Sequence, residues 1–465
     1  MGVAVSHWPL ARAVASAGQL GVVSGVGIDT VFVRRLQDRG VDDELQSVLD
    51  RFPCPSVVEE VVAKFGTTRR PEWKQYRGVP MLSHRTVQSS QDLNVLAAYA
   101  EVAQAKAGHD GLVGINLLTK VQIPTVPILF GAMLAGVDYV QMGAGIPVEI
   151  PGILDRLAQG ELVETQLNVT GNASAPHVPV LRFDPERLTP HRALRRPRFL
   201  AIVSSHVLAK TLARRSTGKV DGFVVESPVA GGHNAPPRGP LTLDDDGSPI
   251  YGDRDRVDFA AIKDLGVPFW IGGGVTSPQR VREAFDLGAA GVQVGTLFAY
   301  CRESGMDPPL KEKVIAAARN GSVRVMTSAR ASSTGYPFKV ACVDGTLSDK
   351  EVYARRRRVC DLSYLREAYL KADETVGYRC PGEPVESYLA KGGRREDTVD
   401  RVCLCNALAS TAGFGQVRRE SFREPPIVTS GDCVNDIALL LGGKSDYSAA
   451  DVIAYLQNDW ASGSY

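Results

Sequence analysis

A histidine preceded by two glycines follows a short apolar run, and this arrangement suits acid–base chemistry. Residues 222–234 read Gly-Phe-Val-Val-Glu-Ser-Pro-Val-Ala-Gly-Gly-His-Asn. The apolar start predicts a short buried strand, and Gly232 lets the backbone of the next turn approach a ligand closely. Imidazole can take or give a proton near neutral pH. His233 is therefore the candidate catalytic base, and Glu226, at the strand end, either orients a basic side chain or caps the turn.

Two later segments also join a strand to glycines. They read Pro-Phe-Trp-Ile-Gly-Gly-Gly-Val-Thr-Ser over 268–277 and Gly-Val-Gln-Val-Gly-Thr-Leu-Phe over 291–298. A glycine turn after a strand can present backbone N–H groups to a phosphate. One such glycine alone is explained equally well by a tight turn, but two such turns in succession predict a phosphate site. Its candidate residues are Gly272, Gly273, Gly274, Gly295 and Thr296.

Elements that could position these residues alternate regularly along residues 1–320. Short apolar runs predict strands over 1–5, 20–25, 111–118, 138–145, 199–204, 222–226, 268–272 and 291–295. Helical patterns lie between them, over 89–107, 125–135, 206–214, 259–265, 277–287 and 310–318. Such alternation implies parallel strands with right-handed crossovers. We expect an α/β fold, a (β/α)₈ TIM barrel, because the late glycine turns follow the seventh and eighth strands, where barrels bind phosphate. An open doubly wound sheet is the alternative.

Three stretches break this rhythm. Residues 159–197 form an insertion between the fourth and fifth predicted strands. Residues 234–257 follow His233 and predict either a lid or a solvated surface loop. The pattern ends near residue 320, and 321–465 is expected to be an extra, mainly helical C-terminal segment packed on the barrel.

Composition excludes several classes of partner. The 465 residues carry a net charge of +1, with 44% hydrophobic and 23% charged residues, as in ordinary globular proteins. So balanced a charge gives no sign of nucleic-acid binding. No apolar run approaches the roughly 20 residues needed to span a bilayer, and no secretory signal pattern opens the chain. We therefore expect a cytoplasmic protein with no membrane or nucleic-acid partner.

Four of the eight cysteines crowd into residues 360–405. Four thiolates can hold zinc or an iron–sulfur cluster, so Cys360, Cys380, Cys403 and Cys405 are candidate metal ligands. Their spacing matches no ferredoxin pattern. Buried, reduced cysteines acting as small hydrophobic residues are the alternative.

Five motifs, in order, resemble the nitronate monooxygenase family, formerly called 2-nitropropane dioxygenases. Met-Gly-Val-Ala-Val-Ser at the start, with Leu-Ala-Arg-Ala-Val-Ala-Ser-Ala-Gly-Gln-Leu-Gly-Val-Val from residue 10, looks like the family's first strand-helix-strand unit. Gly-Ile-Asn-Leu at 114–117, Ala-Gly-Gly-His at 230–233, and the turns Ile-Gly-Gly-Gly-Val and Gln-Val-Gly-Thr match later motifs. The resemblance covers most of residues 1–300. It extends to flavin-dependent enoyl reductases on the same scaffold, including trans-acting ones.

This resemblance implies non-covalent FMN and a histidine base. The glycine turns would hold the phosphate. Asn116 and Gln293 would hydrogen-bond the polar edge of the flavin, and Lys120 would stabilise its reduced form. Gly143 and Glu226 would lie nearby, at the end of the barrel where the strands finish. The implied reaction is oxidation of a nitronate or nitroalkane by O₂ to a carbonyl compound and nitrite, with His233 as base.

Other functions stay open at this point. An FMN- and NAD(P)H-dependent enoyl reductase would act on carrier-bound or CoA-bound acyl chains in fatty-acid or polyketide assembly, with an acyl carrier protein as partner. The long lid and C-terminal segment would suit such a bulky substrate. A barrel that serves only binding or assembly is a non-enzymatic alternative, and a second copy of the chain, as a homodimer, is a further candidate partner. A nucleotide dehydrogenase would need a cysteine on the loop that carries His233, and that loop has none.

Overall fold

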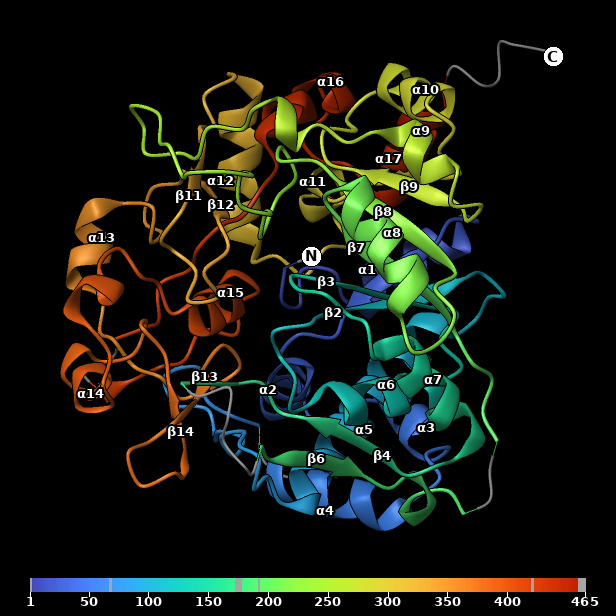
Figure 1. The fold of residues 1–465 in the computed structure, drawn as a ribbon, viewed down its shortest axis with the longest axis vertical. Helices are drawn as coiled ribbons and strands as arrows, with labels where there is room; N and C mark the ends of the chain where they lie inside the picture. The colour runs from blue at the N-terminus through green and yellow to red at the C-terminus, as the bar shows by residue number, and fades with distance from the viewer. Residues whose placement is uncertain (1, 67–68, 172–177, 191–192, 420–421, 459–465) are drawn as a thin grey trace.

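A parallel sheet forms the centre of the molecule (Figure 1). The structure is a computed structural model that describes residues 2–66, 69–171, 178–190, 193–419 and 422–458. Seven strands lie in the order β1-β2-β3-β7-β8-β9-β10, all parallel. Their bounds are Gly21–Ser24, Val113–Leu118, Tyr139–Gly143, Arg198–Val203, Gly222–Glu226, Phe269–Gly272 and Gly291–Gln293. Strands adjacent in this series are adjacent in space, as in a TIM barrel, so the predicted α/β barrel fold is confirmed.

The first predicted strand, over residues 1–5, does not form among the described residues. Residues 3–5 lie in a turn, and Met1 falls outside the described part of the chain. The backbone there bonds outward instead, because Ser24 N–H donates to Ser6 O and Gly305 N–H donates to Val5 O. The sheet of the described residues therefore has seven paired strands, and the N-terminal turn lies between the first strand and the region after the last one.

Helices cover the outer face of the sheet. In the first half they are α1 (Trp8–Ser16), α2 (Ile28–Arg39), α3 (Asp43–Leu49), α4 (Pro55–Phe65), α5 (Gln88–Lys106), α6 (Thr125–Leu134) and α7 (Ile150–Gln159). Next come α8 (His206–Arg215), α9 (Phe259–Lys263), α10 (Pro278–Asp286), α11 (Thr296–Ala299) and α12 (Pro308–Arg319). The predicted helices are all present. Side-chain caps fix two of their starts, since Ser205 accepts from Leu208 N–H and Ser277 from Arg280 N–H.

The large core lies between the sheet and these helices. Alternate strand residues such as Val23, Ile115 and Val140 point outward into it and are fully buried. The residues between them point into the barrel. Tyr139, Leu200, Val224 and Trp270 pack there as a separate apolar cluster. This cluster closes the interior below the carboxyl ends of the strands and leaves those ends for a site.

The insertion 159–197 is built from short strands. β4 (Val163–Gln166) pairs with β6 (Val180–Phe183), and the helical turn η1 (Pro185–Arg187) follows. β5 (Val169–Thr170) pairs instead with β13 of the C-terminal segment. Parts of the insertion lie outside the described residues. The insertion therefore also connects the barrel to residues 321–465.

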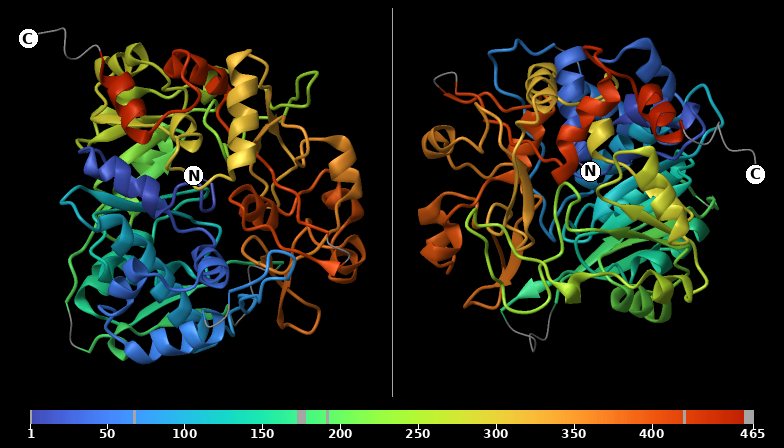
Figure 2. Two further views of the ribbon diagram at one scale, coloured as in Figure 1. Left: turned by 180° about the vertical axis from the view of Figure 1, so that it is seen from behind. Right: turned by 90° about the horizontal axis from the view of Figure 1, so that it is seen from above.

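The C-terminal segment contains helices and two unpredicted hairpins. Its helices are α13 (Lys350–Arg355), α14 (Val385–Ala390), α15 (Leu404–Thr411), α16 (Ile437–Leu441) and α17 (Ala449–Gln457). β11 (Val325–Ser328) pairs with β12 (Phe338–Ala341), and β13 (Glu367–Leu370) pairs with β14 (Val376–Arg379). Figure 2 shows the orange part of this segment beside the barrel, with the red helices returning over its last units. Among the described residues, no helix combines the length and apolar composition that crossing a bilayer requires.

Candidate active site

Polar side chains point into the barrel on the first three strands. Asn116 pairs in register with Ser24 on one side and Gln141 on the other, so the three share the inner face. Asn116 is only 4% exposed, and its amide donates to Gln141 O at 3.5 Å. The side-chain oxygens Ser24 Oγ and Gln141 Oε1 are buried without a partner among the described residues. Buried polar atoms are normally hydrogen-bonded, so this face is suited to a polar ligand.

A second row of residues faces the barrel interior from the last three strands. Glu226, Gly272 and Gln293 are register partners across β8, β9 and β10. Gln293 Oε1 is another buried atom with no partner in the part of the chain that the structure describes. Burial raises the pKa of Glu226 to about 7, because the charged carboxylate is poorly solvated there. The prediction that these residues share one mouth with Asn116 agrees with this register.

The two predicted phosphate turns differ in the free space around their glycines. Gly273 and Gly274 have φ of +90° and +74°, and a Cβ on Gly273 would lie 2.5 Å from Ser227 Oγ. Gly273 is thus required by backbone conformation and packing. A Cβ on Gly295 would meet open space, with no atom of another described residue within 4 Å. Thr296 Oγ1 already accepts from Gly431 N–H at 3.0 Å, so its hydroxyl is shared with the C-terminal segment.

His233 is held by residues from beyond the barrel. Its Nε2 lies 2.7 Å from Ser332 Oγ, which is 2.8 Å from Thr334 Oγ1. Phe338 packs edge-on to the imidazole, with ring centroids 4.9 Å apart. Burial lowers the pKa of His233 to about 4. The imidazole is therefore neutral at physiological pH, which is the form that can accept a proton.

The backbone around His233 is clamped by the same segment. Lys339 N–H donates to Gly232 O at 2.8 Å, and Asn234 N–H donates to Pro337 O at 2.9 Å. Gly232 N–H donates to Thr429 Oγ1 at 2.8 Å. These bonds leave the glycine turn little freedom, so the C-terminal segment fixes the position of the candidate base.

A polar pocket lies on the other side of the turn, under the predicted lid. Glu226, Ser204 and Ser227 line its floor, and residues from 235 to 255 line its roof. Arg238 donates through its backbone N–H to Asp255 Oδ1 and through its guanidinium to Ser204 O. The loop thus lies over the end of β8, where a lid would be, and closure by it stays a prediction. The loop also includes the helical turn η2 (Asp253–Asp255).

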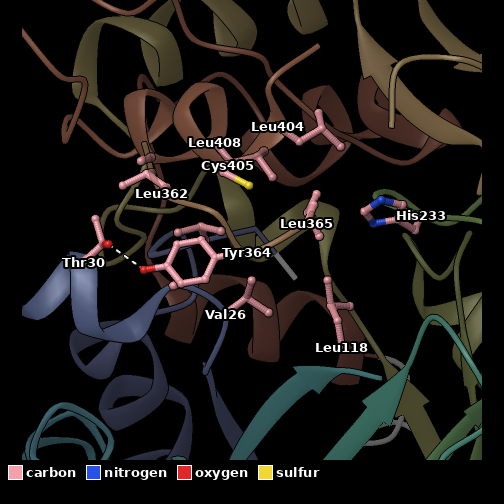
Figure 3. A pocket seen from close by; sticks show the side chains of 13 residues that line it. Val26, Thr30, Leu118, His233, Leu362, Tyr364, Leu365, Leu404, Cys405 and Leu408 are labelled. Carbon is pink, nitrogen blue, oxygen red and sulfur yellow. Dashed lines mark hydrogen bonds between the residues drawn. The ribbon is translucent and has the colours of Figure 1, made fainter. Parts of the chain in front are cut away.

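An apolar cavity also reaches His233 (Figure 3). Leu118, at the end of β2, lines it from the barrel side, and Val26 and Thr30 line it near the start of α2. Leu362, Tyr364 and Leu365 come from the loop before β13, and Leu404, Cys405 and Leu408 come from α15. The cavity therefore lies between the barrel and the C-terminal segment, with His233 at one end.

Two other predicted cofactor residues have surroundings that the sequence did not indicate. Lys120 is exposed, and its ammonium lies over the ring of Tyr336, 5.6 Å from the centroid. Gly143 packs so tightly that a Cβ would lie 2.9 Å from Ile202. Gly143 therefore has a packing role, while a role for Lys120 beside a flavin stays a prediction.

The four C-terminal cysteines come together as thiols. The Cys405 thiol donates to Cys403, which lowers the pKa of Cys403 and raises that of Cys405. Burial raises the pKa of Cys360 to about 12 and that of Cys380 to about 11. Within residues 2–458, leaving out the undescribed gaps, no group of three or more His, Cys, Asp or Glu side chains is arranged to hold a metal ion. The described residues therefore show no arrangement of Cys360, Cys380, Cys403 and Cys405 that matches the predicted zinc or iron–sulfur site.

Comparison with known proteins finds a family match for the central part of the chain. Residues 153–336 match the nitronate monooxygenase family. This matched region makes up less than half of the chain. It contains His233, both glycine turns and Ser332, whereas Asn116 and Lys120 precede it. The residues proposed for proton transfer and phosphate binding therefore all lie within the matched region.

Three known proteins illustrate what this chain is similar to. A probable nitronate monooxygenase of Bacillus subtilis (strain 168) is 36% identical over 98 residues, which are 21% of this chain and 26% of that protein. The match thus spans about a quarter of that relative's length. A nitroalkane oxidase from Streptomyces ansochromogenes is 14% identical with a TM-score of 0.49, covering 99% of this chain and 94% of that one. FabK from Thermotoga maritima is 14% identical with a TM-score of 0.45, covering 98% and 90%.

The partners of His233 could not be found from sequence patterns. Ser332, Thr334 and Phe338 lie about a hundred residues beyond the histidine, in the segment that follows the predicted barrel. Residues 331–337 read Ala-Ser-Ser-Thr-Gly-Tyr-Pro. Such a hydroxyl-rich stretch before a strand signals a polar turn, but nothing in it points to His233.

Proposed function

We propose that this protein is an FMN-dependent oxidoreductase that oxidises nitronates or nitroalkanes with O₂ to a carbonyl compound and nitrite, with His233 as base. The observation that carries this proposal is a neutral, partly buried imidazole at the mouth of the barrel within a nitronate monooxygenase region. A nitroalkane must lose the proton next to its nitro group, and a neutral imidazole can take it.

The residues at the mouth fit a flavin. The side-chain oxygens of Gln141, Gln293 and Ser227, which lack partners among the described residues, would accept hydrogen bonds from the ring N–H or the ribityl hydroxyls of the flavin. Backbone N–H groups near Gly274 and Gly295 would hold the phosphate, and the space at Gly295 is open. When bound, the flavin supplies the route by which substrate electrons reach O₂.

Ser332 would set the tautomer of His233. For Nδ1 to accept the substrate proton, Nε2 must carry its own proton and donate to Ser332 Oγ. The Ser332 hydroxyl would then donate to Thr334 Oγ1, which lies at 2.8 Å. This chain of donors keeps the imidazole oriented and stabilises the imidazolium that proton transfer creates.

The apolar cavity favours a second candidate function. An enoyl reductase that uses NAD(P)H would place an acyl chain, carrier-bound or CoA-bound, in such a cavity, and His233 would then give a proton to the α-carbon. The walls contributed by α15 and the 362–365 loop suit a longer substrate than a small nitroalkane. The two candidates differ in the electron donor, so they can be separated directly.

An anaerobic visible spectrum of the FMN-loaded protein distinguishes them. We expect propyl-2-nitronate to bleach the flavin band and NADPH to leave it unchanged. Bleaching by NADPH alone would replace the first proposal by the enoyl reductase. A protein that cannot be loaded with FMN would contradict both.

A further inference from the structure

The apolar cavity beside His233 has a wall without free polar side-chain groups among its described residues. The hydroxyl of Thr30 is bonded to that of Tyr364, and Tyr364 Oη donates to the buried carboxyl of Asp29. The imidazole Nε2 is engaged by Ser332, and the Cys405 thiol donates to Cys403. What remains facing the cavity is aliphatic and aromatic carbon from leucine, valine, alanine and tyrosine side chains. Such a cavity binds apolar groups in preference to water.

The cavity is elongated and has two distinct ends. His233 stands at one end, next to Leu118 and Leu365, and Tyr364 with Thr30 stands at the other (Figure 3). Leu404, Cys405 and Leu408, from one face of α15, lie along the side between these ends. A ligand that extends from the imidazole would therefore run between the barrel and the C-terminal segment, toward Tyr364.

We propose that this cavity holds the unbranched hydrocarbon chain of the substrate, with the reactive carbon at His233 and the chain end toward Tyr364. The proposal rests on the proposed function, which places the reactive carbon at the imidazole. Each buried methylene gains hydrophobic free energy, and the cavity offers no polar partner that would stabilise a hydroxylated chain. The flavin ring system is a poor occupant because its polar edge would lack partners there.

It follows that the C-terminal segment sets the chain length. Leu362, Leu365 and Leu408 belong to residues 321–465, whereas Leu118 and Val26 belong to the barrel. The same chemistry can come from two sources, a nitroalkane or an acyl thioester. Both would lie in the same cavity, and they differ only in the group that faces His233.

Calorimetric titration of the FMN-loaded His233→Asn protein under nitrogen tests the assignment, because this variant is expected to bind nitroalkanes without removing their proton. The probes are straight-chain 1-nitroalkanes and trans-2-enoyl-CoA thioesters of increasing length. We expect Kd to tighten by about fourfold for each added methylene until the cavity is full, and then to level. The series that shows this trend identifies the source. An affinity independent of length in both series would overturn the proposal.

A larger side chain that fills part of the cavity provides the second test. Leu362→Trp, at the end of the cavity near Thr30 and Tyr364 (Figure 3), should stop the gain in affinity at a shorter chain and leave nitroethane binding unchanged. Leu439→Trp is the matched control, because Leu439 is 65% exposed on α16. If Leu362→Trp fails to fold, as judged by circular dichroism and thermal melting, Leu408→Phe on the side wall of the cavity replaces it. An unaltered length dependence in a folded variant would contradict the assignment.

Failure of the cavity assignment and failure of the proposed function give different results. If the chain-length trend appears but propyl-2-nitronate never reduces the flavin, the nitronate oxidation is wrong and the cavity assignment stands. If nitronate is oxidised but affinity ignores chain length, the oxidation stands and the cavity assignment is wrong.

Discussion

At the scale of single residues, the burial of His233 decides which proton transfers the site can perform. Burial lowers its pKa to about 4, so the neutral form prevails over the whole physiological range. Ser332 anchors one ring nitrogen, and the other is left for substrate. A base of this kind is needed for a neutral nitroalkane, but a nitronate has already lost the proton. The two substrates therefore separate proton abstraction from the rest of the reaction.

His233→Asn should consequently affect one substrate far more than the other. We expect kcat/KM for 2-nitropropane to fall by about 10²- to 10⁴-fold, the range typical of a lost general base. The value for propyl-2-nitronate should fall much less, because no proton has to be removed. Steady-state oxygen consumption measures both, with flavin content checked by absorbance. An equal loss for the two substrates would show that His233 binds substrate and removes no proton.

Glu226 should make the stability of the protein depend on pH in a defined direction. Its folded pKa is raised to about 7 from an ordinary value of 4.5, so the folded state holds a proton that the unfolded state loses. This contribution is complete below about pH 4.5 and is lost as the pH rises through 7. Glu226→Gln should flatten that fall in the free energy of unfolding, measured by urea titration at a series of pH values. Glu386→Gln, with a side chain that is 82% exposed, is the control and should not change the slope.

At the scale of elements, the carboxyl ends of the strands are predictable and their long-range partners are not. Asn116, Glu226 and Gln293 are expected at one mouth because each ends or follows an apolar run, and parallel strands bring such ends together. Ser332 and Thr429 reach the His233 turn through contacts across about 100 and 200 residues. No local pattern specifies such pairings. Residues 3–5 form a turn for a similar reason, since the hydrogen bonds of this stretch go to distant loops rather than to a strand.

The two glycine turns should respond differently to the same substitution. Gly273→Ala places a Cβ 2.5 Å from Ser227 Oγ at a φ of +90°, which we expect to cost about 1–3 kcal/mol of unfolding free energy. Gly295→Ala meets open space at a φ of −113° and should change stability by less than about 0.5 kcal/mol. Urea unfolding followed by circular dichroism measures both. Equal tolerance would mean that the Ser227 loop moves aside freely.

At the scale of the whole molecule, the barrel and the C-terminal segment share a core. Arg324 of the C-terminal segment forms an ion pair with Asp246, in the loop after His233, at 3.0 Å. Residues 321–465 are thus integrated with the barrel in both packing and charge. A protein reduced to residues 1–320 would expose the shared cluster and lose the partners of the candidate base. That cluster buries Leu10 and Val14 of α1 and Leu297 of α11 together with Ile437, Leu441, Val452 and Leu456 of α16 and α17.

Shared burial predicts that the two parts unfold together. Ile437 is completely buried in the common cluster, so Ile437→Ala should lower the free energy of unfolding by about 2–5 kcal/mol. Because barrel residues line the same cluster, the barrel should lose its structure in the same transition. A Trp460→Phe background leaves tryptophan fluorescence to the part of the chain before residue 320, where the other tryptophans lie. Far-ultraviolet circular dichroism then reports on the whole chain. In that background the two signals should shift to lower urea concentration by the same amount, whereas Leu439→Ala, next to the cluster but exposed, should shift neither. A second transition in which only circular dichroism changes would mean that residues 321–465 unfold independently of the barrel, and that the clamp on His233 can open without loss of the fold.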